Sequence, residues 1–165
     1  MVLQDYSKAH DCFHLALSLT DTSSSHYPVL CNRVGATLAN SGKSEEALLY
    51  YARALEINPG YVRARYNLGI SCVGLGRYEE AAQHMLNALS FQDADASTKE
   101  QDEAGITSTT MWSSLKTTFL HMERLDLAQL CDRHDLDGMS SYFRIIVSHT
   151  HEYHSCTLQR TILII

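Results

Sequence analysis

The sequence predicts an all-α fold, and three observations carry this prediction. Proline and glycine are scarce, with two prolines and eight glycines in 165 residues, so long helices can run without interruption. Apolar residues make up 45% and charged residues 19% of the chain, a balance typical of a globular domain and not of a disordered segment. Apolar residues also recur at spacings of three and four, which is the period of a helix that buries one face.

A repeat of 34 residues organises the first half of the chain. Shifting the sequence by 34 positions places small residues on small residues: Gly35 on Gly69, Ala47 on Ala81, and Ala54 on Ala88. Small side chains are needed where two helices approach closely, and larger apolar residues lie between them. Each repeat is therefore predicted to be an antiparallel pair of helices.

Four helices follow from the repeat, with expected ranges 28–41, 44–57, 62–75 and 78–91. Ser44, followed by two glutamates, is predicted to cap the start of a helix. Asn58-Pro59-Gly60 is predicted to end the same helix, because proline cannot continue it and glycine supplies free backbone angles. The full repeats then cover 28–61 and 62–91. A half repeat over 1–19, with a helix over 6–19, precedes them.

The second half of the chain is expected to cap these repeats. Residues 92–110 are polar, acidic and rich in Ser and Thr, which predicts a linker. Helices over 111–122, 124–132 and 136–147 are predicted to form a C-terminal helical bundle spanning 111–147. Residues 148–165 form a tail to which no structure is assigned.

The 34-residue period with small residues at these positions resembles the tetratricopeptide repeat. The resemblance implies about two and a half repeats stacked into a superhelix. Its concave side, lined by the first helix of each pair, would receive an extended peptide. Binding, and not catalysis, is the function that this fold class implies.

Asparagines on the predicted first helices mark a candidate peptide-binding surface. Asn32 and Asn40 are eight residues apart with alanines between them, and Arg63 and Asn67 are neighbours four residues apart on the next such helix. Asparagine both donates and accepts hydrogen bonds, so it can pair with a peptide backbone of any sequence, while arginine can pair with a carboxylate. The alternative is that these side chains are solvated and bind nothing.

Two stretches give a more specific resemblance. Residues 30–48 read LCNRVGATLANSGKSEEAL and residues 53–72 read RALEINPGYVRARYNLGISC. They look like the last two repeats of the peroxisomal targeting signal 1 receptor family, the peroxin-5 family, and the likeness extends roughly from Asp5 to Phe143. The chain is thus identified as a truncated or divergent fragment related to that family.

The resemblance implies a cytoplasmic receptor that cycles to the peroxisome membrane. It would hold the C-terminal targeting peptide, of the Ser-Lys-Leu type, of peroxisomal matrix proteins, and peroxisomal docking proteins would be further partners. The family motif assigns peptide binding to five residues of this chain: Asn32, Arg33, Asn40, Arg63 and Asn67. Where the family usually has a further asparagine, this chain has Gly74. Binding is expected to be weak in isolation.

Composition and motifs argue against nucleic-acid binding, membrane spanning and catalysis. The net charge of −6 gives no basic field for nucleic acid. No apolar run reaches the roughly 18 residues of a membrane span. The chain has no phosphate-binding loop, no Gly-x-Ser-x-Gly elbow and no His-Glu-x-x-His helix, so no enzyme, catalytic residue or cofactor is expected. The scattered cysteines are predicted to be reduced core thiols: Cys12, Cys31, Cys72, Cys131 and Cys156.

Two alternatives stay open. One alternative is a chaperone-type repeat domain, which clamps acidic C-terminal peptides with several lysines and arginines, whereas this surface offers only Arg33 and Arg63. A generic tetratricopeptide-repeat adaptor is a related alternative. A metal could also be held by soft ligands in the tail, but their spacing matches no recognised site, so no metal is expected. These ligands are His149, His151, His154 and Cys156.

Overall fold

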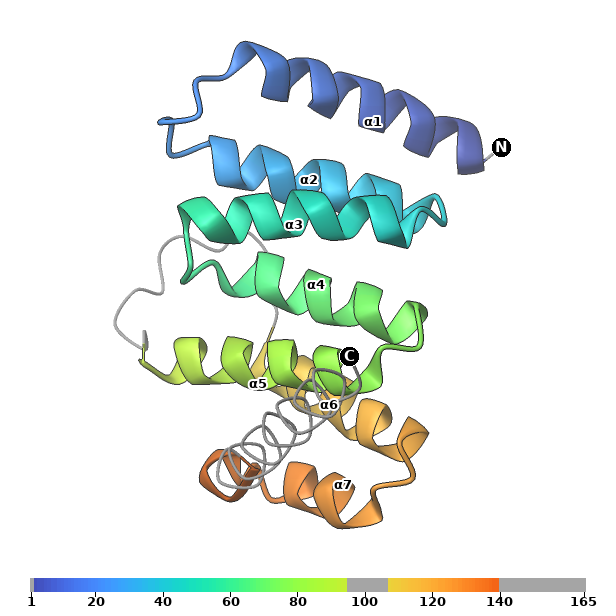
Figure 1. Cartoon of the computed structure of the whole chain (residues 1–165), viewed down its shortest axis with the longest axis vertical. Coiled ribbons are helices and arrows are strands. Elements are labelled where there is room, and N and C mark those ends of the chain that lie inside the picture. Colours follow the sequence, from blue (N-terminus) through green and yellow to red (C-terminus); the bar gives the residue numbers. More distant parts are fainter. Residues whose placement is uncertain (1, 95–106, 140–165) are drawn as a thin grey trace, which may run out of the picture.

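The computed structural model describes residues 2–94 and 107–139, and within these residues all regular structure is helical. Figure 1 shows the helices stacked along the long axis from α1 to α7. The all-α prediction is confirmed. The helices labelled in Figure 1 are α1 (Val2–Leu19), α2 (Tyr27–Asn40), α3 (Ser44–Ile57), α4 (Val62–Gly74), α5 (Tyr78–Ala94), α6 (Ser108–His121) and α7 (Leu125–Asp132).

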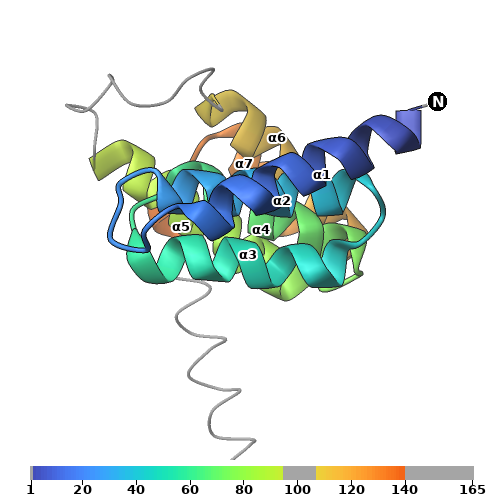
Figure 2. The same cartoon turned by 90° about the horizontal axis from the view of Figure 1, so that it is seen from above.

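The helices pack mainly against their neighbours along the chain. α2 and α3 form one pair and α4 and α5 form the next, while α1 packs against α2, and α6 packs against α5 and α7. The first helices of successive pairs also meet, because α2 contacts α4 and α4 contacts α6. We call α2, α4 and α6 the inner helices. Seen along the stack, α3 lies on one side and α6 on the other (Figure 2).

The predicted helix ranges in the repeats agree with the structure to within one residue, except at the start of α1 and the end of α5. α1 begins at Val2, four residues before the start expected at residue 6 in the half repeat. α5 continues to Ala94, three residues beyond its expected end at 91. Phe91 explains part of the extension, because its ring packs 5.1 Å from the guanidinium carbon of Arg65 and so keeps this turn attached to α4. Residues 92–94, expected in the linker, are therefore helical.

The linker is also shorter than expected at its other end. α6 begins at Ser108, where the side chain of Thr107 accepts a hydrogen bond from the backbone N–H of Thr110. This cap starts the helix three residues before the apolar pattern does. Residues 108–110, expected in the linker, thus belong to α6, and residues 95–106 lie outside the described part of the chain.

Two details of the predicted helix ends are wrong. Lys43, not Ser44, is the N-cap residue of α3, and it makes no side-chain cap hydrogen bond. Gly60 does not use a positive φ; that backbone freedom is used at Gly42 (φ +84°) and Gly76 (φ +74°). These two glycines are 34 residues apart and turn the chain between the two helices of each pair.

The small residues of the repeat lie where the helices meet, as predicted. A Cβ atom on Gly35 would lie 2.7 Å from Cε1 of Tyr51, and one on Gly69 would lie 3.1 Å from Cγ of Met85. No side chain larger than hydrogen fits at Gly35 without a shift of the ring. The alanines aligned by the repeat are fully buried at Ala47, Ala54, Ala81 and Ala88.

The buried side chains form three clusters. The first, between α2, α3 and α4, contains Val34, Leu38, Ala47, Tyr51 and Leu68. A small cluster of Cys31, Ala54 and Ala64 lies beside it, sharing contacts with Leu17 and Leu55. The third runs through α5, α6 and α7 and continues to Met139, with residues such as Met85, Leu89, Met111, Trp112, Leu115, Phe119 and Leu127.

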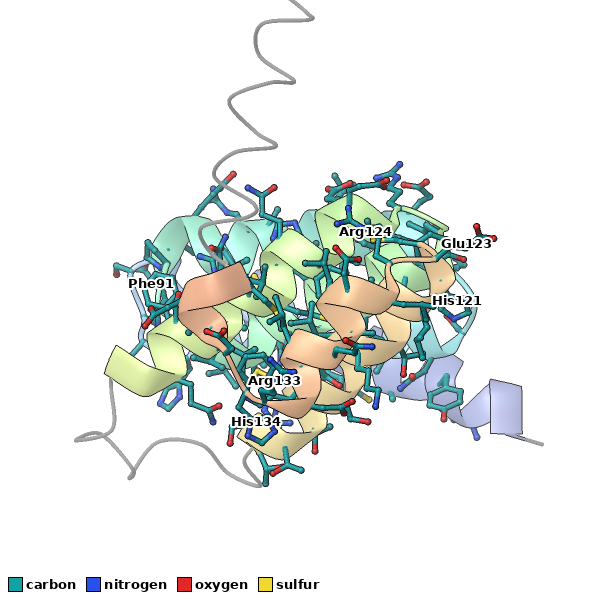
Figure 3. All side chains as sticks on the ribbon, turned by 90° about the horizontal axis from the view of Figure 1, so that it is seen from below. Phe91, His121, Glu123, Arg124, Arg133 and His134 are labelled. Atoms are coloured by element: carbon teal, nitrogen blue, oxygen red, sulfur yellow. The ribbon has the colours of Figure 1, made fainter. Side chains whose placement is uncertain are left out.

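The C-terminal helices cap the second repeat. Trp112 of α6 is buried and stacks on His134, which follows α7, with ring centroids 5.1 Å apart. Figure 3 views this end of the molecule and shows His121, Glu123 and Arg124 together at the turn between α6 and α7, with Phe91 at the opposite edge. Residues 136–139 begin a further helix where one was predicted, but most of the range 136–147 and the whole tail lie outside the described residues.

The cysteines match the prediction of core thiols in part. Cys31, Cys72 and Cys131 are buried and reduced, whereas Cys12 is reduced but exposed. The prediction for Cys12 is wrong because, among the described helices, α1 packs against α2 alone and its other face stays open to solvent. Cys156 lies outside the described residues.

Candidate functional site

A hydrogen-bonded pair of asparagines links the two inner helices of the repeats. The Nδ2 group of Asn67, on α4, donates to Oδ1 of Asn32, on α2, over 2.9 Å. Asn32 is 4% exposed and Asn67 is half-buried, so the pair lies at the rim of the packed interface between α2 and α4. This contact fixes the orientation of the Asn67 amide. The Oδ1 atom of Asn67 takes no part in this hydrogen bond.

The start of α4 supports the same pair. The Nδ2 group of Asn32 also donates to the hydroxyl of Tyr61 over 3.4 Å, just before α4 begins. Arg63 is half-buried one turn before Asn67 on α4. The structure thus brings Asn32, Asn67 and Arg63 into one region, with two amides and a guanidinium group.

Asn40 lies at the other end of the inner surface. It is exposed at the last residue of α2, and the helical rise of 1.5 Å per residue puts it about 12 Å along the axis from Asn32. One repeat later, at the last residue of α4, stands Gly74, which is also exposed. A Cβ atom there would have Oγ of Ser44 as its nearest neighbour, 4.0 Å away. The position that the resemblance marks for an asparagine therefore has room for a Cβ atom.

Arg33 is the candidate residue that lies apart from the amide pair. Its side chain is exposed, and its guanidinium carbon lies 5.8 Å from the centroid of the Phe13 ring on α1. A cation and an aromatic face attract each other at this distance. Arg33 thus lies on the α1 side of α2, whereas Asn32 contacts α4.

The inner surface continues onto α6 through residues that sequence reasoning missed. Tyr66, next to Asn67, shares a hydrogen bond of 2.8 Å with Ser114 of α6. Beyond it, α4 and α6 enclose an open hollow of about 180 Å³, lined by Ile70, Val73, Ser113, Ser114, Thr117 and Thr118. Tyr66 lies 34 residues after Asn32, so the two residues occupy equivalent positions in successive repeats. Each connects its inner helix to the next one, and the 34-residue offset could have revealed this.

The buried ionisable groups near these helices are neutral at physiological pH. Burial raises the pKa of the Cys72 thiol to about 11, and burial raises that of the Tyr51 hydroxyl to about 12 against the opposing hydrogen bond from Ser71. A nucleophilic cysteine needs a lowered pKa, which Cys72 does not have. The polar groups of the inner surface are suited to hydrogen bonding with a ligand.

Comparison with known proteins agrees with the presence of the repeat. A family model described as "Tetratricopeptide repeat" matches residues 38–99. No described helix combines the length and apolar character that crossing a bilayer requires.

Curated relatives were found among fungal receptors. The chain is 42% identical over 127 residues to the peroxisomal targeting signal receptor of Candida albicans, an alignment that covers 77% of this chain and 21% of the relative. The receptor of Yarrowia lipolytica is 46% identical over 124 residues, covering 75% of this chain and 20% of the relative. That of Saccharomyces cerevisiae is 40% identical over 128 residues, covering 76% and 20%.

The chain spans about a fifth of the length of the curated relatives it matches. These relatives are receptors by name. The chain therefore has the helix-pair fold of the tetratricopeptide repeat, and over about three quarters of its length it is similar to the peroxisomal targeting signal receptors.

Proposed function

We propose that the chain is a peptide-binding receptor module for C-terminal peroxisomal targeting signals of the Ser-Lys-Leu type. The observation that carries this proposal is the Asn32–Asn67 pair, with Arg63 one turn away on α4. In the cell, the module would belong to a cytoplasmic receptor that cycles to the peroxisome membrane, where docking proteins would be further partners.

The amide pair is suited to a peptide backbone. With its Nδ2 group held by Asn32, Asn67 presents its Oδ1 in a fixed orientation to a backbone N–H of the ligand. Holding the amide in place before binding lowers the entropy lost when the peptide docks. Arg63 supplies a positive charge for the terminal carboxylate, a pairing that gives a short, charge-assisted hydrogen bond.

The spacing along α2 fits a short extended peptide. Asn40 is about 12 Å from Asn32 along the helix axis. An extended chain advances about 3.3–3.6 Å per residue, so the two asparagines are separated by three to four peptide residues. Asn32 and Asn67 at one end and Asn40 at the other would thus engage the two ends of a tripeptide.

The affinity of this chain alone is expected to be low. The described inner surface is formed by α2, α4 and α6, so a bound peptide keeps one side in water. Each of its hydrogen bonds then replaces one with solvent, for a net gain of about 1 kcal/mol. A dissociation constant near or above the millimolar range, about −4 kcal/mol, follows.

The experiment is a titration with three peptides, measured by calorimetry or fluorescence anisotropy: one ending in Ser-Lys-Leu, its amidated twin, and one ending in Glu-Val-Asp. We expect the free Ser-Lys-Leu terminus to bind best. Equal binding of the amidated twin would show that the carboxylate is not recognised and would refute the proposal. Tighter binding of the Glu-Val-Asp peptide would favour the chaperone-type clamp.

Variants locate the site. Asn67→Ala removes the amide that faces the peptide and should weaken binding about fivefold, the equivalent of about 1 kcal/mol. Asn87→Ala is the matched control, because Asn87 is an exposed asparagine on α5, outside the inner helices. Binding that falls equally in both variants would contradict the assignment of the site to the inner helices.

A further inference from the structure

A cysteine, a glutamate and a histidine meet between the two helices of the second repeat. Cys72 lies near the end of α4, and Glu80 and His84 lie one turn apart at the start of α5. One ligand atom from each, the thiol sulfur, a carboxylate oxygen and a ring nitrogen, lie within 4.8 Å of one another. Two rigid helices therefore hold these three side chains close together. The cysteine and histidines of the tail were not predicted to have such a scaffold.

The histidine of this cluster has an unsatisfied nitrogen. Nδ1 of His84 is buried and has no hydrogen-bond partner among the described residues. Its other ring nitrogen, Nε2, lies 3.9 Å from Oε1 of Glu80, too far for a hydrogen bond. A buried polar group without a partner destabilises a fold unless something outside the chain satisfies it.

The three side chains are buried to different depths, as a metal site that opens to solvent requires. Cys72 is fully buried, His84 is 23% exposed and Glu80 is 49% exposed. The thiol therefore lies at the bottom of the cluster and the carboxylate at its mouth, which leaves a path from solvent. Gly69, one turn before Cys72, lets α5 approach, because a Cβ atom there would lie 3.2 Å from the backbone oxygen of Ala81.

The surrounding charges do not exclude a cation. Arg77, close to Cys72 in sequence, pairs with Glu45 over 3.0 Å, so its charge is partly offset. Arg65 lies on the His84 side, where its Nη2 group donates to the backbone oxygen of Pro59 over 2.7 Å and its guanidinium packs on the ring of Phe91. These contacts direct both guanidinium groups toward other partners.

We propose that Cys72, Glu80 and His84 form a binding site for Zn²⁺ that joins α4 to α5. Thiolate, imidazole and carboxylate are the usual zinc ligands, and a fourth, tetrahedral position would be filled by water at the exposed mouth. On binding, the sulfur of Cys72 forms a bond to the metal and its proton is released to solvent. The three ligand atoms lie within 4.8 Å of one another, so they would move closer together to bind one ion.

The first repeat serves as an internal comparison. The residues one repeat earlier are Leu38, Glu46 and Tyr50, which keep the carboxylate but replace the sulfur and the imidazole. The site is therefore a property of the second repeat and not of the repeat pattern itself. It uses none of the side chains assigned above to the peptide.

The test is a titration of the whole, chelator-treated chain with Co²⁺, followed by displacement with Zn²⁺. Thiolate coordination gives a charge-transfer absorption band in the near ultraviolet, which zinc should abolish. We expect one equivalent of Co²⁺ to give this band, and Cys72→Ser to remove it. Glu80→Gln and His84→Gln should weaken the affinity at least about tenfold, a loss of the size seen when support for a metal ligand is removed.

Two controls separate this site from others. A chain carrying His149→Ala, His151→Ala, His154→Ala and Cys156→Ser should keep the band, and so should Cys131→Ser, which alters a different buried thiol. Glu80→Gln changes a surface residue, so circular dichroism should show that it remains folded even if Cys72→Ser does not. Absence of a band in the parent chain, its loss with the tail ligands, or its full retention in Glu80→Gln and His84→Gln would overturn the proposal.

Discussion

Gly35 lies directly against the ring of Tyr51, so that a Cβ atom on the glycine would come within 2.7 Å of the ring. The corresponding contact in the second repeat is looser, because a Cβ atom on Gly69 would meet Cγ of Met85 at 3.1 Å. Both partners are buried, with Tyr51 2% and Met85 0% exposed, but the planar ring of Tyr51 can adapt less than the unbranched side chain of Met85. The two repeats therefore differ in how closely their helices can be packed around glycine.

This difference predicts unequal effects of one methyl group. Gly35→Ala should lower the free energy of unfolding by about 1–3 kcal/mol through overpacking. Gly69→Ala should cost less, because its Cβ would meet its nearest atoms, Cγ of Met85 and the backbone oxygen of Ala81, at 3.1 and 3.2 Å instead of 2.7 Å. The gain in helix propensity of about 0.8–1.0 kcal/mol is common to both variants. Urea unfolding of both variants measures the difference. Equal destabilisation would show that the ring of Tyr51 adapts as easily as the methionine.

Restoring an amide at the end of α4 should strengthen peptide binding. A Cβ atom at position 74 would meet no atom closer than Oγ of Ser44, and the Gly74→Asn side chain would lie one repeat after Asn40. One added hydrogen bond is worth about 1 kcal/mol, so the dissociation constant for the Ser-Lys-Leu peptide should fall about fivefold. Gly74→Ala is the control: it shares the gain in helix propensity but adds no amide. An equal gain in affinity for both variants would attribute the effect to helix stability.

The stability of the protein should decrease in alkali, in part because of Tyr51. Its hydroxyl has a pKa of about 12 in the folded chain, against 10.0 as the ordinary value. Above pH 10 the unfolded chain loses this proton while the folded chain retains it, so raising the pH favours unfolding. The loss is about 1 kcal/mol between pH 9 and pH 11.

The measurement is the free energy of unfolding in urea at both pH values. Tyr51→Phe removes the ionisable group and should flatten the pH dependence by that amount, although Cys72 and Cys131 keep a part of it. A variant that is as sensitive to alkali as the parent chain would mean that Tyr51 ionises as readily when folded as when unfolded.

The cysteines should react with a thiol reagent at very different rates. Cys12 is exposed, whereas Cys31 and Cys72 are fully buried and Cys131 is 2% exposed. Burial also raises the pKa of Cys131 to about 12, so its reactive thiolate is scarcer than that of an ordinary cysteine at neutral pH. Mass spectrometry of native protein after brief alkylation should find Cys12 labelled first. Rapid labelling of Cys31 or Cys131 would be incompatible with the packing described.

Much of the fold could be predicted because one period governs it. The 34-residue offset placed Ala47, Ala54, Ala81 and Ala88 at helix contacts, and all four are fully buried. The ends of α5 and α6 could not be predicted from this period, since they depend on Phe91 packing on Arg65 and on the cap at Thr107. Cys12 was misplaced because helical periodicity does not show which face of α1 a neighbour covers.

The candidate site shows the same division. Residue types and spacing predicted Asn32 and Asn67 as candidate binding residues. Their hydrogen bond depends on the register between α2 and α4, which cannot be derived from the sequence. The spacing of Glu80 and His84 was visible in the sequence as an i, i+4 pair. Their meeting with Cys72 required the pairing of α4 with α5.

The position of α4 has a consequence for how the chain unfolds. Leu68 and Ala64 of this helix belong to the clusters on the N-terminal side, whereas Val62, Tyr66 and Val73 pack against the C-terminal cluster. Loss of either half would expose one side of α4 and weaken its hold on the other. In stacked repeats such a shared interface couples neighbouring units energetically. α4 thus makes the two halves a single cooperative unit, so that fraying should begin at α1 and stop before it reaches this helix.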